Sequence, residues 1–323
     1  MKTMILGQTG VEVSAICLGA MEFGTAISKD KSYEVLDMYF ENGGRFLDTA
    51  NIYAHWLEGG KGGDSEAFIG QWMRDRGNRG EMFIATKLGF DMPGETGTLR
   101  PDAIKSECES SLQRMGIDTI DLYYAHRDDQ ETPLEESLKA FDELVAGGKV
   151  RFLGASNFMA WRLERARDLS RANGWAEYCC LQQRHSYLRL QAGTTFTPQL
   201  TINEDLMAYS RAEGFPMLAY TPLLGGCYVR EDRQLPAQYL GVDSDNRIQA
   251  ARKLGGLLGA TPNQIVLAWM MQGDPPIIPI IATGNPEHLR ENLAVENLQL
   301  TAEQLAELDA AGICGERNMV LIS

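Results

Sequence analysis

Eight short and almost wholly apolar runs recur along the chain, and a longer segment with a helical pattern follows each of them. A run that is apolar on both faces indicates a strand that is covered on both sides. Strands that alternate with helices predict parallel strands joined by helical crossovers. We therefore predict strands at residues 15–19, 45–50, 82–87, 121–126, 150–156, 177–183, 215–221 and 277–283.

Helix-ending and capping signals mark the segments between these runs. Residues 30–44 end in a Gly-Gly pair, and residues 101–116 begin with proline and end with glycine, as helices often do. Residues 132–148 begin with Thr132, and Glu135 follows three residues later. This spacing predicts a capping box at the start of that helix.

Eight strand–helix units favour an α/β fold closed as a (β/α)8 TIM barrel, although periodicity alone leaves an open doubly wound sheet as an alternative. Residues 4–14 hold polar residues and Gly10 between two apolar pieces, which predicts an N-terminal β-hairpin. The sequence shows no linker and no low-complexity tract, so we expect residues 1–323 to form a single barrel domain.

The chain is strongly acidic, with a formal net charge of −14. This charge argues against nucleic acid and anionic membranes as partners, because both would repel it. The first residues lack a signal-peptide pattern, and no apolar stretch is long enough to cross a bilayer. The six cysteines show no metal-ligand spacing, so we expect no metal site and reduced thiols. A cytoplasmic monomer or small homo-oligomer is the resulting expectation.

Ionisable residues stand at the ends of three consecutive predicted strands. Asp48, Lys87 and His126 end the second, third and fourth strands, and Tyr53 lies in the loop after the second. Each alone has an ordinary structural explanation, such as a helix cap for Asp48 or a satisfied core histidine for His126. Strand ends of a barrel meet at one face, however, where active sites form. The four residues therefore predict a catalytic site.

The chemistry of such a group follows from proton affinities. A free phenol has a pKa of about 10, and a neighbouring ammonium lowers it. We expect Lys87 to lower the pKa of Tyr53 in this way, Asp48 to hold Lys87, and His126 to donate a hydrogen bond to a carbonyl oxygen. Such an arrangement protonates a carbonyl, which is what a hydride acceptor needs.

The motifs around these residues resemble those of the aldo-keto reductases, over essentially the whole chain. FLDTANIY, IATK and YYAHR resemble the family's tetrad segments, which implies that Asp48, Tyr53, Lys87 and His126 are the catalytic residues. GGDSEAFIGQWM resembles a helix start of the family that has a structural role. The resemblance implies NAD(P)H-dependent reduction of aldehydes or ketones, or the reverse reaction, with Tyr53 as proton donor.

Four further segments, FLGASNF, LQQRHSYL, AYTPLLGG and ATGNPEHLREN, resemble the family's cofactor-binding segments. The resemblance implies that the first two hold the nicotinamide carboxamide, that the third stacks on the nicotinamide and approaches the pyrophosphate, and that the fourth holds the adenosine end. No GxGxxG follows a strand, which favours the barrel over the doubly wound sheet. The implied cofactor residues are Ser156, Asn157, Gln182, Tyr220, Leu223, Gly225, Thr283, Asn285, His288, Glu291 and Asn292.

One departure from the family concerns the choice of cofactor. Many relatives carry a lysine or arginine that holds the 2′-phosphate of NADP, whereas residues 282–285 contain no cation. His288 and Arg290 are the nearby positive side chains. A phosphate favours charged donors, so NAD is an alternative to the NADP that the resemblance implies.

The loop at residues 53–66 is glycine-rich and longer than usual, and we expect it to shape the substrate mouth. Apolar walls suit a small carbonyl or a sugar face. Alternative functions are an NAD-dependent sugar or polyol dehydrogenase, a Schiff-base lyase acting through Lys87, and a cofactor-binding regulatory subunit like the potassium channel β subunits. The predicted pocket residues are Met21, Phe23, His55, Trp56 and Tyr187.

Overall fold

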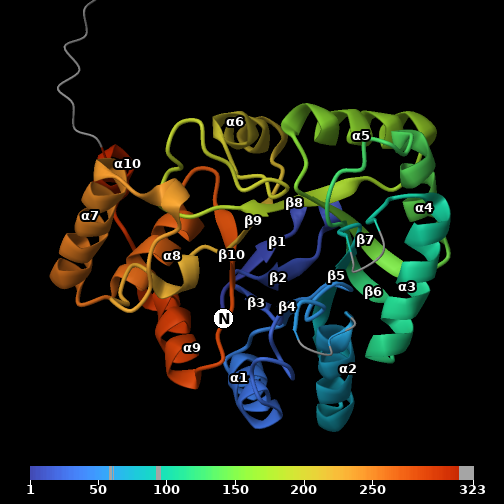
Figure 1. The fold of residues 1–323 in the computed structure, drawn as a ribbon, viewed down its shortest axis with the longest axis horizontal. Coiled ribbons are helices and arrows are strands. Elements are labelled where there is room, and N and C mark those ends of the chain that lie inside the picture. The colour runs from blue at the N-terminus through green and yellow to red at the C-terminus, as the bar shows by residue number, and fades with distance from the viewer. Residues whose placement is uncertain (58–59, 61, 92–95, 313–323) are drawn as a thin grey trace, which may run out of the picture.

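The computed structural model describes residues 1–57, 60, 62–91 and 96–312, and in these ranges eight parallel strands close into a barrel (Figure 1). Strand β10 pairs with β3 as well as with β9, so the sheet has no open edge. Every predicted strand and the predicted TIM barrel are confirmed. The strands are β3 (Cys17–Gly19), β4 (Phe46–Asp48), β5 (Phe83–Leu88), β6 (Ile120–Ala125), β7 (Val150–Ser156), β8 (Tyr178–Arg184), β9 (Met217–Tyr220) and β10 (Ile277–Ile281).

Helices surround the barrel, and α7 and α10 lie beside one another at its outer edge (Figure 1). No helix within the described ranges is both long enough and apolar enough to cross a membrane. The helices are α1 (Lys29–Glu41), α2 (Asp64–Arg76), α3 (Pro101–Met115), α4 (Leu134–Ala146), α5 (Ala160–Asn173), α6 (Glu204–Glu213), α7 (Val242–Leu258), α8 (Pro262–Gln272), α9 (Pro286–Leu293) and α10 (Ala302–Ala310).

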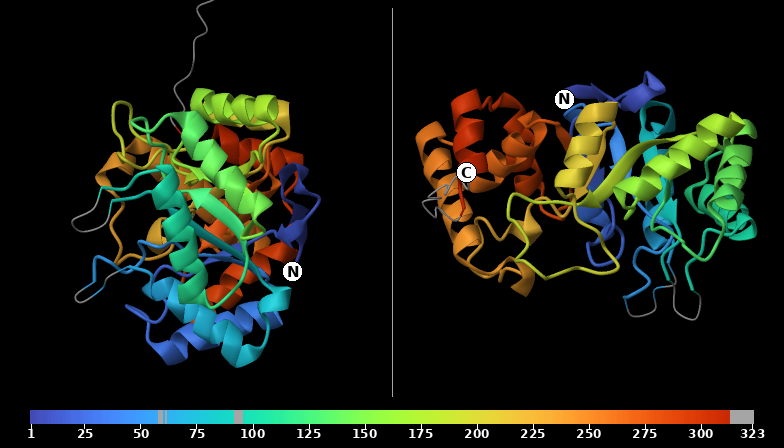
Figure 2. Two further views of the ribbon diagram at one scale, coloured as in Figure 1. Left: turned by 90° about the vertical axis from the view of Figure 1, so that its right-hand side faces the viewer. Right: turned by 90° about the horizontal axis from the view of Figure 1, so that it is seen from above.

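The predicted N-terminal hairpin is also confirmed. Strands β1 (Thr3–Ile5) and β2 (Glu12–Ser14) pair antiparallel and lie across one end of the barrel (Figure 2). Leu6 and Val13 extend from the hairpin into the apolar cluster inside the barrel, where Phe46 and Phe83 also pack. The hairpin therefore closes the end at which the strands begin and leaves the opposite end for a site.

The predicted capping box at Thr132 is wrong. Helix α4 begins after Pro133, and no side chain caps it. The Thr132 hydroxyl instead donates to Asp129 Oδ2 at 2.7 Å. Asp129 also accepts hydrogen bonds from Leu99 N and Thr98 Oγ1, each at 2.8 Å, so it joins the loops after β5 and β6. Because Pro133 occupies the N-cap position of α4, Thr132 lies one residue outside the helix end, and its oxygen caps no N–H of the first turn.

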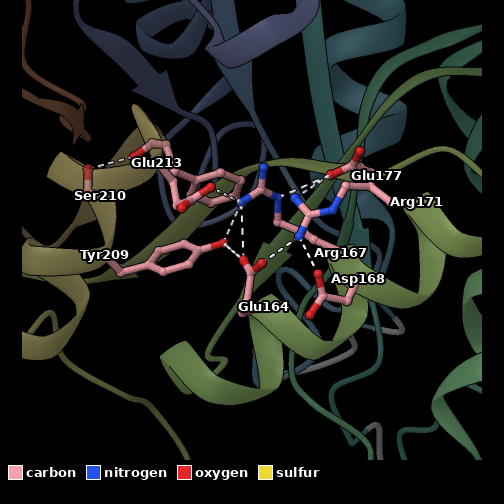
Figure 3. A network of polar contacts seen from close by, with 9 residues as sticks. Glu164, Arg167, Asp168, Arg171, Glu177, Tyr209, Ser210 and Glu213 are labelled. Carbon is pink, nitrogen blue, oxygen red and sulfur yellow. Dashed lines mark hydrogen bonds and ion pairs between the residues drawn. The ribbon is translucent and has the colours of Figure 1, made fainter.

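A buried arginine fastens α5 to α6 at the outside of the barrel (Figure 3). Arg167 donates to Tyr209 Oη at 2.5 Å, lies 3.3 Å from a carboxylate oxygen of Glu177, and places its guanidinium 4.8 Å from the ring centre of Phe215. A cavity of about 300 Å³ beside this network is lined by residues at the beginnings of β7 and β8 and by the hairpin turn. The cavity therefore lies at the end of the barrel opposite the predicted catalytic residues.

Candidate active site

Four predicted catalytic side chains meet where β4, β5 and β6 end. Lys87 Nζ donates to Asp48 Oδ1 at 2.5 Å, to the Thr49 carbonyl at 2.7 Å and to Tyr53 Oη at 3.1 Å. The ring centres of Tyr53 and His126 are 6.1 Å apart. Because parallel strands run together to one edge, residues far apart in the sequence converge here.

Lys87 is fully buried, yet its environment keeps it charged. Burial alone lowers the pKa of Lys87, but Asp48 and Tyr53 outweigh that effect, and the pKa lies above its ordinary value. A lysine that forms a Schiff base must lose its proton first. The raised pKa therefore argues against a Schiff-base lyase.

The predicted direction of the Tyr53 pKa shift is wrong. Burial raises the pKa of Tyr53, and the Lys87 charge offsets only part of that increase. The ammonium acts as expected, but removal of water from the phenol has the larger effect. Tyr53 is therefore protonated at neutral pH, as a proton donor must be.

His126 is neutral in this environment. Burial, together with the positive charges of Lys87 and Arg127, holds the pKa of His126 well below its ordinary value. Its backbone is fixed on both sides, because its N–H donates to the Leu88 carbonyl and its carbonyl accepts from Asn157 Nδ2. Its Nδ1 is buried and has no hydrogen-bond partner among the described residues. The imidazole is thus available as a neutral hydrogen-bond donor.

The residues predicted to hold the nicotinamide form one polar cluster beside Asp48. Asn157 Nδ2 donates to Ser156 Oγ at 3.1 Å, and Asn157 Oδ1 accepts from Tyr220 Oη at 2.8 Å. Gln182 Nε2 donates to Asp48 Oδ2 at 2.8 Å. Asn157 N also donates to the Gln182 carbonyl at 3.3 Å, so the cluster runs from Asp48 to Tyr220.

The loop after β9 contains several residues in the left-handed region of backbone conformation. Thr221, Leu224 and Gly225 have positive φ angles of 60°, 50° and 69°. A Cβ placed on Gly225 would meet no atom within 4 Å, so the backbone beside it is open. Left-handed residues in a turn create concavities of backbone N–H groups that suit phosphates. The role expected of Leu223 and Gly225 at the pyrophosphate stays a prediction.

The predicted adenosine segment lies at the start of α9. Asn285 caps the helix by accepting from Glu287 N at 2.9 Å, and Thr283 Oγ1 accepts from Asn285 N at 3.0 Å. His288 is exposed, whereas Asn292 is buried. Glu291 Oε1 accepts from Thr261 Oγ1 at 2.6 Å. The carboxylate of Glu291 therefore joins α9 to the start of α8. The sequence does not reveal this contact.

Three of the predicted pocket residues lie on the active face. Trp56 is 48% exposed and Met21 37% exposed, and His55 is partly buried. The Trp56 ring centre lies 6.2 Å from that of Tyr53 and 5.0 Å from that of His55. Residues 58, 59 and 61 of the predicted mouth loop lie outside the described residues.

The prediction is wrong for the other two pocket residues, which are packed in the core. Phe23 and Tyr187 are each 1% exposed. Tyr187 donates its hydroxyl hydrogen bond to the Leu308 carbonyl at 2.7 Å, and its ring packs edge-on against Trp269 at 5.0 Å. These contacts anchor α10 to the barrel. Apolar residues near a strand end serve either core or pocket, and sequence spacing does not distinguish the two.

Phe90 is a site residue that the sequence analysis missed. Its ring lies edge-on to His126 with 4.5 Å between the ring centres, and the Arg127 guanidinium lies 5.5 Å from its ring centre. Phe90 follows Lys87 by three residues, so its position just beyond a catalytic strand end was the available signal.

Comparison with known proteins gives one consistent result. The model of the Aldo/keto reductase family matches residues 15–313. Aldo-keto reductase str7 of Strobilurus tenacellus is 33% identical over 92% of this chain and 86% of its own. Aryl-alcohol dehydrogenase GME11368 of Pestalotiopsis microspora is 26% identical over 95% and 80%. The solved structure of the thermostable aldo-keto reductase Tm1743 with the inhibitor epalrestat superposes with a TM-score of 0.76, at 28% identity, over 97% of this chain and 100% of that one.

Proposed function

Because the chain belongs to the aldo/keto reductase family, we propose that it reduces aldehydes or ketones to alcohols, or catalyses the reverse reaction, with Tyr53 as the proton donor. The observation that carries the proposal is the position of Lys87 Nζ between Asp48 Oδ1 and Tyr53 Oη, at 2.5 Å and 3.1 Å. Bound NAD(P)H supplies the hydride. The residues of the chain supply the proton and the charge stabilisation.

Each catalytic side chain has a separate task in this proposal. Tyr53 keeps its proton until the carbonyl oxygen gains negative charge, and the Lys87 ammonium stabilises the tyrosinate that remains. Asp48 and the Thr49 carbonyl hold Lys87 by two short hydrogen bonds. Neutral His126 donates a hydrogen bond to the same carbonyl oxygen and orients the substrate.

For the cofactor we propose NADP(H), with NAD(H) accepted. Ser156, Asn157, Gln182 and Tyr220 would hold the nicotinamide, and Leu223 and Gly225 would lie at the pyrophosphate. The adenosine segment offers exposed His288 and Arg290, but Arg290 is already paired with Glu287 at 2.5 Å. An exposed imidazole and an arginine that is already paired give limited selectivity for a phosphate. We therefore expect both cofactors to bind, with a modest preference for NADPH.

Aromatic rings beside the proton donors favour a carbonyl with an aryl substituent. Trp56 stands against Tyr53, and Phe90 stands against His126, so both residues that would touch the carbonyl oxygen have an aromatic neighbour. An aromatic pair contributes about 0.5–1.5 kcal/mol beyond its buried area. One relative is named an aryl-alcohol dehydrogenase. These observations support aryl aldehydes and ketones over open-chain sugars.

The proposal is tested by turnover of a benzaldehyde and a straight-chain aldehyde with NADPH and with NADH. Tyr53→Phe should bind cofactor normally and lose roughly 10²–10⁴-fold in kcat, the usual contribution of a general acid. Trp56→Ala and Phe90→Ala should each narrow the preference for benzaldehyde about 2–10-fold. Trp161→Ala, which removes a 57% exposed indole, is the matched control. Cofactor binding without turnover of any carbonyl or alcohol would favour a regulatory subunit.

A further inference from the structure

A hydrogen bond ties the loop that carries Tyr53 to helix α3. Asn51 Nδ2 donates to Glu107 Oε2 at 2.8 Å. Asn51 is 3% exposed, whereas the Glu107 side chain is 32% exposed. Asn51 Oδ1 is buried and has no hydrogen-bond partner among the described residues. The contact with Glu107 is therefore what orients the Asn51 side chain.

The backbone of Asn51 connects this contact to the catalytic strand ends. Asn51 N donates to the Lys87 carbonyl at 3.1 Å, and Tyr53 N donates to the Ala50 carbonyl at 3.2 Å. A Cβ on Gly62 would lie 2.8 Å from the Asn51 carbonyl oxygen, so the returning loop packs closely on the same residue. A displacement of Asn51 thus moves the turn that presents Tyr53 to Lys87.

Glu107 is itself fixed by a network that returns to β5. Arg114 lies 3.7 Å from Glu107 Oε2 and donates from Nε to Glu66 Oε2 at 2.6 Å. Glu66 is fully buried, and its other oxygen accepts from Thr86 Oγ1 at 2.5 Å. Thr86 directly precedes Lys87. Contacts from α2 and α3 therefore reach both the Lys87 strand end and the Tyr53 loop.

We propose that Glu107 is a positioning residue, which sets the distance between Tyr53 Oη and Lys87 Nζ through Asn51. The inference rests on the proposed reductase function. It assigns a task to a partly exposed carboxylate of α3 that touches neither Tyr53 nor Lys87. Misplacement of a reacting group by about 1 Å costs on the order of 10²-fold in rate, so a single hydrogen bond in the supporting structure has a measurable effect.

Reversal of the polarity of the contact gives a sharp test. Asn51→Asp places a carboxylate against Glu107 and removes the donor. Asn51→Asp with Glu107→Gln restores one hydrogen bond, now donated by the glutamine amide. Asn51→Asp with Glu109→Gln removes the same charge from α3 without restoring the bond, since Glu109 pairs with Lys149 instead. The two double variants have equal net charge, and each loses one partly exposed ion pair of α3, Glu107 with Arg114 or Glu109 with Lys149. Only the Glu107→Gln double variant restores a hydrogen bond to residue 51.

The measurements are single-turnover rate, cofactor Kd from nicotinamide fluorescence, melting temperature, and the pH dependence of alcohol oxidation. Asn51→Asp should lose about 10–100-fold in rate with its cofactor Kd little changed. The Glu107→Gln double variant should recover most of that loss, and the Glu109→Gln double variant should not. The oxidation profile of Asn51→Asp should move to higher pH, because Tyr53 loses contact with Lys87.

Equal rates for the two double variants would overturn the positioning role and leave the reductase in place. If Asn51→Asp does not fold, Glu107→Ala decides the matter, because its side chain is partly exposed and the substitution adds no charge. An unchanged rate and an unchanged pH profile in Glu107→Ala would likewise overturn the proposal. Failure of the proposed reductase function would be seen in the wild-type chain itself. It would then turn over no carbonyl, whether or not it binds the cofactor.

Discussion

At the scale of single residues, opposing effects on one side chain decide the chemistry of the site. Burial and the Lys87 charge shift the pKa of Tyr53 in opposite directions, and burial has the larger effect. Reduction needs protonated Tyr53, so its rate should stay level with rising pH until the raised pKa is passed. Oxidation needs the tyrosinate and should rise through the same pKa.

Lys87→Met tests the effect of the ammonium on the pKa of Tyr53. Loss of the ammonium removes a contribution that lowers the pKa of Tyr53, so that pKa rises further and the oxidation limb moves to higher pH. The rate in both directions should also fall by about 10²–10⁴-fold. pH–rate profiles for both directions provide the measurement. Lys105→Met, which breaks an exposed pair with Glu143, is the control and should leave both profiles unchanged.

The sequence predicted which residues come together at the site. It did not predict how their surroundings shift the pKa values of these residues. Asp48 ends β4, Lys87 is the second-last residue of β5, and His126 directly follows β6. An apolar run followed by a charge makes such positions visible in the sequence. The sign of the Tyr53 pKa shift depends on how much water the folded loop excludes, and no local pattern encodes that. The prediction that Phe23 and Tyr187 line the pocket was wrong for a similar reason. Segments distant in the sequence bury both side chains, and no local pattern shows this.

At the scale of elements, Asp129 holds together two loops of the active face. Burial alone raises the pKa of Asp129, but its hydrogen bonds from Leu99 N, Thr132 and Thr98 outweigh burial and lower it. A lowered folded-state pKa means that this stabilisation is fully present above the unfolded value. It is lost as pH falls through the folded value.

Asp129→Asn should therefore reduce the free energy of unfolding by about 1–2 kcal/mol at pH 7, because its amide group leaves some of these donors unsatisfied. The difference from wild type should shrink below about pH 4, where the unfolded carboxyl takes up a proton. Urea unfolding of both proteins at pH 7 and below about pH 4 measures this difference in the free energy of unfolding. Asp118→Asn, an exposed site, should change stability at neither pH, and a difference independent of pH would contradict the argument.

Strand positions followed from continuous apolar runs, because a strand buried on both faces leaves little freedom in composition. Helix starts were less certain. Thr132 has the residue type and spacing of a capping box, but α4 begins one residue later, with Pro133 at the N-cap, and the Thr132 hydroxyl donates to Asp129. Capping boxes do form at Thr261 and Thr301, where the structure shows both reciprocal hydrogen bonds. A capping-box pattern therefore forms its hydrogen bonds only where the helix begins directly after the threonine.

At the scale of the whole molecule, barrel closure separates the two ends of the sheet in function. Pairing of β10 with β3 distinguishes a barrel from an open sheet, and this contact joins Ile280 to Cys17, residues near opposite ends of the chain. Periodicity cannot report so distant a contact. The hairpin then closes the end of the barrel where the strands begin. The apolar packing of the hairpin and the predicted catalytic residues therefore lie at opposite ends of the barrel.

Leu6→Ala tests that separation. Leu6 is fully buried inside the strand-start end of the barrel, and removal of such a side chain costs about 2–5 kcal/mol through lost burial and the cavity left behind. Ile5→Ala, on the same hairpin but 59% exposed, should cost little. Both variants should keep the wild-type kcat below their melting temperatures, because the catalytic side chains lie at the other end. A selective loss of kcat in folded Leu6→Ala would mean that the two ends are mechanically coupled through the barrel interior, where Tyr124 packs in the same cluster as Leu6 and lies 5.8 Å from Lys87 Nζ.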